Sequence, residues 1–134
     1  MIQQTINAPG VPAGPIGSYS TCKKVGDTVF ISGTVAWDEA MKPLGGNSAY
    51  AQSRIIFGYI KALMEAAGGQ IDDLVRMTVF TTDMRHQPEF WRARKEFFTG
   101  DFPCSTLVCV SGLFLPELLI EVEATGIIGS APPR

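Results

Sequence analysis

The chain has few charges, no excess of basic residues and no long hydrophobic run. Lys, Arg, Asp and Glu make up 18% of its 134 residues, compared with about 25% in an average soluble domain. Eleven basic residues against thirteen acidic ones, with a pI near 5.3, offer no positive field to a phosphate backbone. The apolar runs at 113–115 and 118–120 are far shorter than the roughly 20 residues that cross a bilayer. The sequence therefore predicts neither a nucleic-acid partner nor a membrane span.

Cysteine and histidine are also scarce. The three cysteines are an odd number without a CxxC pair, and there is a single histidine, His86. This pattern argues against a disulfide framework and against a structural zinc site. The first residues lack a basic stretch followed by an apolar core, so no signal peptide is predicted and a cytoplasmic location is the expectation.

What the sequence does contain is enough apolar mass for one core. Hydrophobic residues make up 46% of the chain, and a chain of this length usually forms one domain. We therefore expect a single domain over residues 1–134. A small chain with so few charges would leave apolar surface uncovered, so the composition also predicts a homo-oligomer.

Proline, glycine and hydrophobic spacing divide the chain into elements. Three prolines and three glycines within 7–18 predict an irregular lead-in over residues 1–18. Apolar residues recur every three or four positions in 48–67, and again from Pro88 until Gly100, which predicts two helices. Alternating or β-branched segments predict strands at 19–25, 28–32, 75–80, 106–110 and 118–126, with a loop at 36–47 and a loose tail at 129–134. The order ββαβαββ predicts an α+β fold with two helices on one face of a sheet.

The other face of that sheet has an unusual composition. In the last strand Leu118, Ile120, Val122 and Ala124 point one way, while Leu119, Glu121 and Glu123 point the other way. Phe80 lies on that second side of its own strand. A face that is simply exposed to solvent would not be expected to combine a large aromatic ring with carboxylates.

Six short segments carry a family resemblance. They are GSYS at 17–20, VGDTVFISG at 25–33, AQ at 51–52, AAGG at 66–69, TVFTTDM at 78–84 and IEVEA at 120–124. In order and approximate spacing they resemble the RidA/YjgF enamine/imine deaminase family, over roughly residues 5–128. Each segment alone is a weak signal, but six in register are specific.

The resemblance implies a chorismate-mutase-like α+β fold that closes as a homotrimer. The sheets would form an inner barrel with the helices outside, and a small-molecule pocket would lie at each subunit interface. Tyr19 and the backbone at Gly33 would bind the substrate, and Glu121 would lie near the attacking water. The implied chemistry is hydrolysis of an imine or enamine without a cofactor or metal.

The sequence departs from the family at the arginine that binds the substrate carboxylate. Counted without gaps, that position is Ser105, preceded by Cys104. Replacing an Arg–carboxylate pair by a hydroxyl forfeits roughly 1.5–3 kcal/mol for each lost charged hydrogen bond. Simple 2-imino acids are therefore expected to be poor substrates, and an unsaturated amino acid such as 2-aminomuconate is the expected alternative.

Each candidate residue also has a structural interpretation. Glu121 could be a solvated or ion-paired strand residue, Tyr19 a ring closing a loop onto the core, and Ser105 a hydroxyl bonded to backbone. Cys104 could be a small hydrophobe instead of a reactive thiol. The whole chain could be a trimeric small-ligand binder without turnover, whereas the pI near 5.3 disfavours ribonuclease activity.

Overall fold

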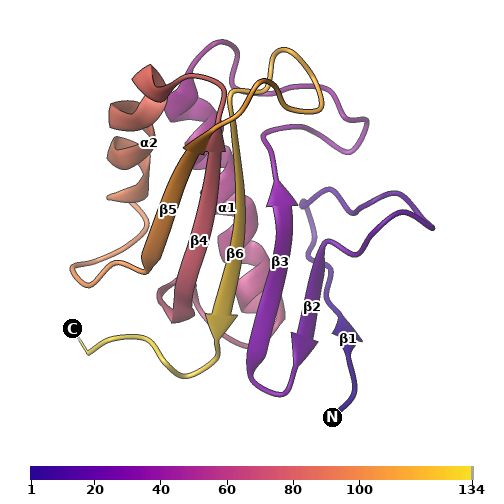
Figure 1. Ribbon diagram of the computed structural model, residues 1–134. Helices are drawn as coiled ribbons and strands as arrows, with labels where there is room; N and C mark the ends of the chain where they lie inside the picture. The colour runs from indigo at the N-terminus through magenta and orange to yellow at the C-terminus, as the bar shows by residue number, and fades with distance from the viewer. Residues whose placement is uncertain (134) are drawn as a thin grey trace.

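The computed structural model describes residues 1–133, which form one mixed sheet with helices on one of its faces (Figure 1). The strands are β1 (Gln4–Thr5), β2 (Cys22–Val25), β3 (Thr28–Thr34), β4 (Leu74–Thr81), β5 (Cys104–Cys109) and β6 (Ile120–Ile127). Their order across the sheet is β1-β2-β3-β6-β4-β5, and the β4–β5 pair is parallel while the other pairs are antiparallel. The helices are α1 (Ala49–Ala66) and α2 (Gln87–Arg94), with short 3-10 turns η1 (Ile71–Asp73) and η2 (Met84–His86). The predicted α+β class with helices on one face is confirmed.

Helix α1 packs its apolar stripe against the sheet. Its N-cap Ser48 accepts a hydrogen bond from the N–H of Ala51 at 3.0 Å. Ile56, Ile60 and Leu63 on the stripe are fully buried. The helix ends before Gly68, whose φ of +98° a glycine adopts without strain. The predicted helix over 48–67 therefore agrees with α1 within one residue at each end.

Helix α2 is shorter than its hydrophobic spacing predicts, because it ends at Arg94 instead of near Gly100. The chain continues in tight turns, in which the N–H groups of residues 95–98 donate to carbonyls three or four residues earlier. These turns keep Phe97 and Phe98 against Phe57 of α1, with ring centroids 5.5 and 5.7 Å away. The aromatic period thus reports packing on α1 and does not require a continuous helix.

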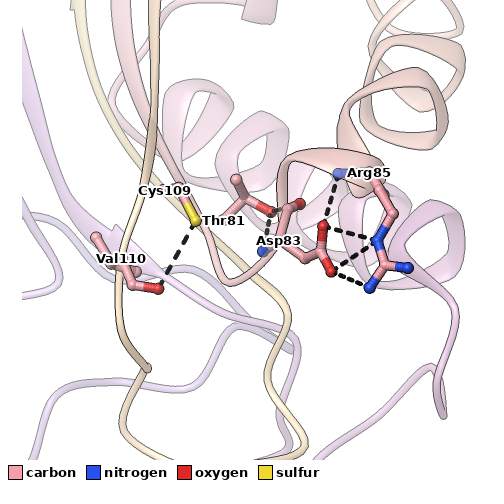
Figure 2. Close-up of polar contacts among 5 residues, drawn as sticks. All are labelled: Thr81, Asp83, Arg85, Cys109 and Val110. Carbon is pink, nitrogen blue, oxygen red and sulfur yellow. Dashed lines mark hydrogen bonds and ion pairs between the residues drawn. The ribbon is translucent and has the colours of Figure 1, made fainter.

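The corner between β4 and α2 is fixed by local hydrogen bonds (Figure 2). The hydroxyl of Thr81 donates to the carbonyl of Asp83 at 2.8 Å. The Asp83 carboxylate accepts from the N–H of Arg85 at 2.9 Å and pairs with the Arg85 guanidinium at 2.6 Å. That guanidinium lowers the pKa of Asp83 to about 2. The N–H of Val110 donates to the carbonyl of Thr81 at 2.8 Å, so the same corner also holds the end of β5.

Several predicted boundaries differ from the structure. Strand β2 begins at Cys22 instead of residue 19, and β1 was not predicted. Leu118 and Leu119 precede β6 and are buried, and the N–H of Leu119 donates to Oε1 of buried Gln52 at 2.9 Å. Leu119 therefore does not share the exposed face with Glu121. In the tail, the N–H of Ala131 donates to Asp73 at 2.9 Å, and Arg134 lies outside the described residues.

The helix-free face of the sheet carries both apolar and charged side chains within residues 1–133. Phe30 is 48% exposed and Val108 is 36% exposed. Lys23 pairs with Phe30 in the sheet and Arg76 pairs with Cys104, so both project among these side chains. No helix in the described part of the chain is long and apolar enough to span a bilayer. The predicted self-association would cover this face and stays a prediction.

Candidate functional site

An irregularity in the sheet brings Gly33 against Glu121. Ile31 of β3 pairs with Ala124 of β6 and Thr34 pairs with Val122, so β3 has one extra residue between these pairs. A Cβ atom built on Gly33 would lie 2.5 Å from Oε2 of Glu121 and 3.0 Å from its Cδ. Only glycine lets the carboxylate lie this close to the backbone of β3.

The Glu121 carboxylate forms part of the wall of an open cavity of about 540 Å³, which we call the Glu121 cavity. Tyr19, Trp37, Met41 and Phe114 supply most of its apolar wall. The rings of Trp37 and Phe114 meet edge to face, with centroids 5.7 Å apart and an interplanar angle of 84°. Ser18, Ser32, Pro15 and Gly33 complete the lining. The volume lies within the range of small-molecule sites.

The loop before α1 holds Trp37 and Met41 in place. The carboxylate of Asp38 accepts hydrogen bonds from the N–H groups of Ala40 and Lys42 at 2.8 and 2.9 Å. Met41 has a φ of +59°, a left-handed conformation that is uncommon outside glycine. The hydroxyl of Tyr59 donates to the carbonyl of Trp37 at 2.7 Å. The strained loop thus presents two apolar side chains to the cavity from a fixed backbone.

Tyr19 is positioned by a second close-approaching glycine. A Cβ on Gly14 would lie 2.5 Å from the carbonyl oxygen of Tyr19 and 2.9 Å from its ring. The N–H of Gly14 donates to the hydroxyl of Thr21 at 2.7 Å, which ties the lead-in to the start of β2. Tyr19 remains 49% exposed. Its ring is therefore available to a ligand and is not sealed into the core.

Glu121 is half-buried, and burial raises the pKa of its carboxyl. The negative charge of Glu123 on the same strand raises that pKa further. No hydrogen bond or ion pair to the carboxylate is formed by any residue in 1–133. A carboxylate with a raised pKa at the wall of a cavity can accept a proton from water and return it to a leaving group.

Within one chain, Cys104 and Ser105 lie apart from this carboxylate. Ser105 pairs with Met77 in the sheet, whereas Glu121 pairs with Phe80, whose other partner is Val108. Ser105 is therefore two strands away and three positions along β5. Cys104 lines a separate depression of about 180 Å³ with residues such as Phe102 and Asp72. The structure brings together Tyr19, Gly33 and Glu121 but not Cys104 and Ser105.

Trp37, Met41 and Phe114 were missed in the sequence. Residues 36–47 were predicted only as a loop, and the apolar run at 113–115 was considered only as too short to cross a bilayer. A usable signal was present, since large apolar side chains stand inside segments bounded by turn-forming residues such as Asp38 and Pro116. Exposed apolar side chains that gather in one place often mark a binding site.

A second depression of about 280 Å³ opens on the same sheet face. Its lining includes Lys23, Arg76 and Glu123, and it shares Ser32 with the Glu121 cavity. Lys23 and Arg76 therefore line this depression, together with Phe30, and do not line the Glu121 cavity. No group of three or more His, Cys, Asp or Glu side chains that could hold a metal ion occurs in the described residues.

Comparison with known proteins covers almost the whole chain. Residues 6–128 match the family model described as endoribonuclease L-PSP. A RutC family protein of Pyrococcus horikoshii is 34% identical over 120 residues, 90% of this chain and 91% of that protein. A protein of Dermatophagoides farinae named 2-iminobutanoate/2-iminopropanoate deaminase is 29% identical over 126 residues, 94% of this chain and 97% of that protein.

Solved structures show the same architecture. A Pseudomonas aeruginosa protein of unknown function has a TM-score of 0.86 and 36% identity, with 99% of each chain covered. RidA from an Antarctic Psychrobacter has a TM-score of 0.84 and 34% identity, with 93% of this chain and 99% of that chain covered. The sequence resemblance is thus confirmed at the level of the family. The chain belongs to the endoribonuclease L-PSP family, which includes the RidA/YjgF proteins.

Proposed function

We propose that this protein is a cofactor-free hydrolase that deaminates an imine or enamine, with Glu121 as the catalytic acid–base. The observation that carries the proposal is the half-buried carboxylate of Glu121, unpaired by residues 1–133 and seated against Gly33 at the wall of an aromatic cavity. A relative named as an imine deaminase, 29% identical over 94% of this chain, supports the reaction class.

The proposed step needs one water molecule and one proton acceptor. The water oxygen forms a bond to the imine carbon while the Glu121 carboxylate takes a proton from that water. The protonated carboxyl then returns the proton to the nitrogen, which leaves a hydroxyl and an amino group on the same carbon. Glu121 next takes the hydroxyl proton and passes it to the nitrogen as the carbonyl forms, the C–N bond breaks and ammonia leaves. A raised pKa suits both halves of this cycle, because it makes the carboxylate a better base than a solvated glutamate.

We further propose that the working unit is a homotrimer whose subunits meet through the helix-free sheet face. The protein is also proposed to be cytoplasmic. The exposure of Phe30 and Val108 on that face supports self-association. β5 is an exposed edge strand, so Cys104 and Ser105 of a neighbouring copy are the residues proposed to approach the Glu121 cavity. In this arrangement they would contribute to substrate binding across the interface.

The position assigned to the family arginine governs the substrate. Ser105 offers a hydroxyl and no charge, so the proposal excludes efficient turnover of simple 2-imino acids. The rings of Tyr19, Trp37 and Phe114 can stack on an unsaturated substrate. 2-Aminomuconate has the conjugated skeleton for such stacking but carries two carboxylates, so its turnover tests whether stacking or charge decides the substrate.

The test measures carbonyl and ammonia formation from imines generated in place by amino-acid and amine oxidases, and from 2-aminomuconate, with catalase to remove peroxide. We expect acceleration over the spontaneous rate and its loss in Glu121→Gln, with Glu65→Gln on the exposed side of α1 as the matched control. Saturable ligand binding without acceleration of any substrate would favour a non-catalytic binder. Sedimentation at assay concentration tests the trimer, and a lone subunit would contradict it.

A second variant tests the position of the missing arginine. Ser105→Arg should create or raise hydrolysis of iminopropionate, because it restores a guanidinium for the substrate carboxylate. An unchanged rate, in a variant that still sediments like the wild type, would mean that position 105 does not face the substrate.

A further inference from the structure

The charge pattern of the Glu121 cavity points to a ligand class, and this inference rests on the proposed function. We infer that the cavity binds an organic cation with an apolar or aromatic group, so that the substrate is an iminium ion without a carboxylate. The observations are three rings, a methionine side chain and one unpaired carboxylate around a single cavity, with no Lys or Arg in its lining.

The aromatic wall suits a cation. Trp37 and Phe114 meet edge to face at 5.7 Å, so their rings are turned in different directions. Tyr19 supplies a third ring and Met41 a polarizable sulfur. A ligand cation against aromatic faces is attracted by the ring quadrupole, an arrangement known from aromatic cages for alkylated ammonium groups. Phe114 is 72% exposed, which leaves its ring accessible to a ligand.

The negative charge of the Glu121 carboxylate also favours a cationic ligand. Glu121 is half-buried beside Gly33 without a counter-ion among residues 1–133. An anionic ligand in this cavity would face a second negative charge with reduced solvent screening. A cation would instead supply the missing partner for Glu121.

The basic residues that are close in sequence or lie on the same sheet face line other depressions. Lys42 follows Met41 in sequence but lines a depression with Pro43 and Glu117. Lys23 and Arg76 line the depression that contains Glu123. Residues 103–116, which include β5 and the loop after it, contain no charged residue. A neighbouring copy that contributed this segment would therefore add no positive charge.

The reaction balances for such a substrate. An iminium R–CH=NH2⁺ and water give the aldehyde R–CHO and NH4⁺, with the C–O bond formed and the C–N bond broken. Glu121 accepts a proton from the water and returns it to the nitrogen. It then takes the remaining hydroxyl proton as the C–N bond breaks, and passes that proton to the departing ammonia, which leaves as NH4⁺. The cationic substrate pairs with the Glu121 carboxylate, whereas the uncharged aldehyde makes no ion pair and is released.

A matched pair of substrates tests the inference. A flavin amine oxidase converts 2-phenylethylamine to an imine, and an amino-acid oxidase converts phenylalanine to the same skeleton with a carboxylate added. With catalase present, we expect kcat/KM for the first imine to exceed that for the second at least tenfold, or about 1.4 kcal/mol. Equal or better turnover of the phenylalanine imine would overturn the inference and leave the proposed deaminase function intact.

Direct binding separates this inference from turnover. We expect benzyltrimethylammonium to quench the fluorescence of Trp37 and to bind at least tenfold more tightly than phenylacetate, with Trp91→Phe used to isolate that signal. Glu121→Gln should abolish the preference, and Phe114→Leu should weaken cation binding severalfold. If neither imine is turned over but this pattern holds, the deaminase function fails and the ligand class stands. Absence of the preference in the wild type would overturn it.

Discussion

Alanine at position 33 should displace the Glu121 carboxylate with little effect on folding. The added Cβ would lie 2.5 Å from Oε2 and 3.0 Å from Cδ of Glu121. An ordinary carbon–oxygen contact is near 3.4 Å, so the carboxylate must move by roughly 1 Å, a shift that can cost about a hundredfold in rate. The clash is with the end of a side chain, which can rotate toward the cavity, so β3 keeps its pairing.

The expected magnitude for Gly33→Ala follows from these two effects. A hundredfold loss of kcat/KM corresponds to about 2.7 kcal/mol in the activation free energy. The free energy of unfolding should change by less than about 1 kcal/mol, because replacing glycine reduces the entropy of the unfolded chain and offsets part of the strain. Activity and stability are thus expected to separate.

The assay compares kcat/KM for imine hydrolysis and urea unfolding in Gly33→Ala and a glycine control. Gly58 is exposed within α1, and a Cβ there would meet no atom within 4 Å. Gly58→Ala should stabilise the protein by about 0.5–1 kcal/mol through helix propensity and leave activity unchanged. Wild-type activity in Gly33→Ala would refute the argument that contact with β3 positions the carboxylate.

Three further variants test the charge and packing described above. Burial raises the folded-state pKa of Glu121, so its ionisation destabilises the fold as pH rises from the ordinary Glu pKa of about 4.3 to that raised value. Glu121→Gln should therefore raise the Tm at pH 7, and the difference in Tm should vanish below about pH 4.3. Gln52→Leu removes hydrogen bonds to the carbonyls of Gly46 and Glu117 and from the N–H of Leu119, and urea unfolding should show a loss of about 3 kcal/mol or more. Phe57→Ala removes a fully buried ring that contacts three others, with an expected loss of about 3–5 kcal/mol in the same measurement. A loss below about 1 kcal/mol would contradict either packing argument.

The parts of the fold that follow periodicity were predictable from the sequence. The apolar stripe of α1 and the alternation of apolar and polar residues in β4 and β6 each reflect burial of one face. A shift of the strand register by one residue would bury polar side chains instead. The second helix was overextended because Phe97 and Phe98 pack on Phe57 from turns at helical spacing. Periodicity records which side chains are buried, and turns can present the same pattern as a helix.

The candidate site was only partly predictable. The family resemblance pointed to Tyr19, Gly33 and Glu121, which the structure places around one cavity. Trp37 and Phe114 reach it from loops whose paths depend on contacts such as the Tyr59–Trp37 hydrogen bond. Such contacts join residues far apart in sequence and leave no periodic signal. The role proposed for Ser105 requires a neighbouring copy, so it stays a prediction.

The site and the proposed subunit interface meet on one sheet face, and this links catalysis to association. An unpaired, half-buried Glu121 and a left-handed Met41 both cost the single chain stability. Phe30 and Val108 on the same face remain exposed to water. Burying that apolar surface between copies would offset the free-energy cost of keeping the Glu121 carboxylate half-buried and unpaired. It would also exclude water from the rim of the cavity, which strengthens the attraction between Glu121 and a cation. The properties that weaken an isolated subunit are therefore those that association would turn into binding and catalysis.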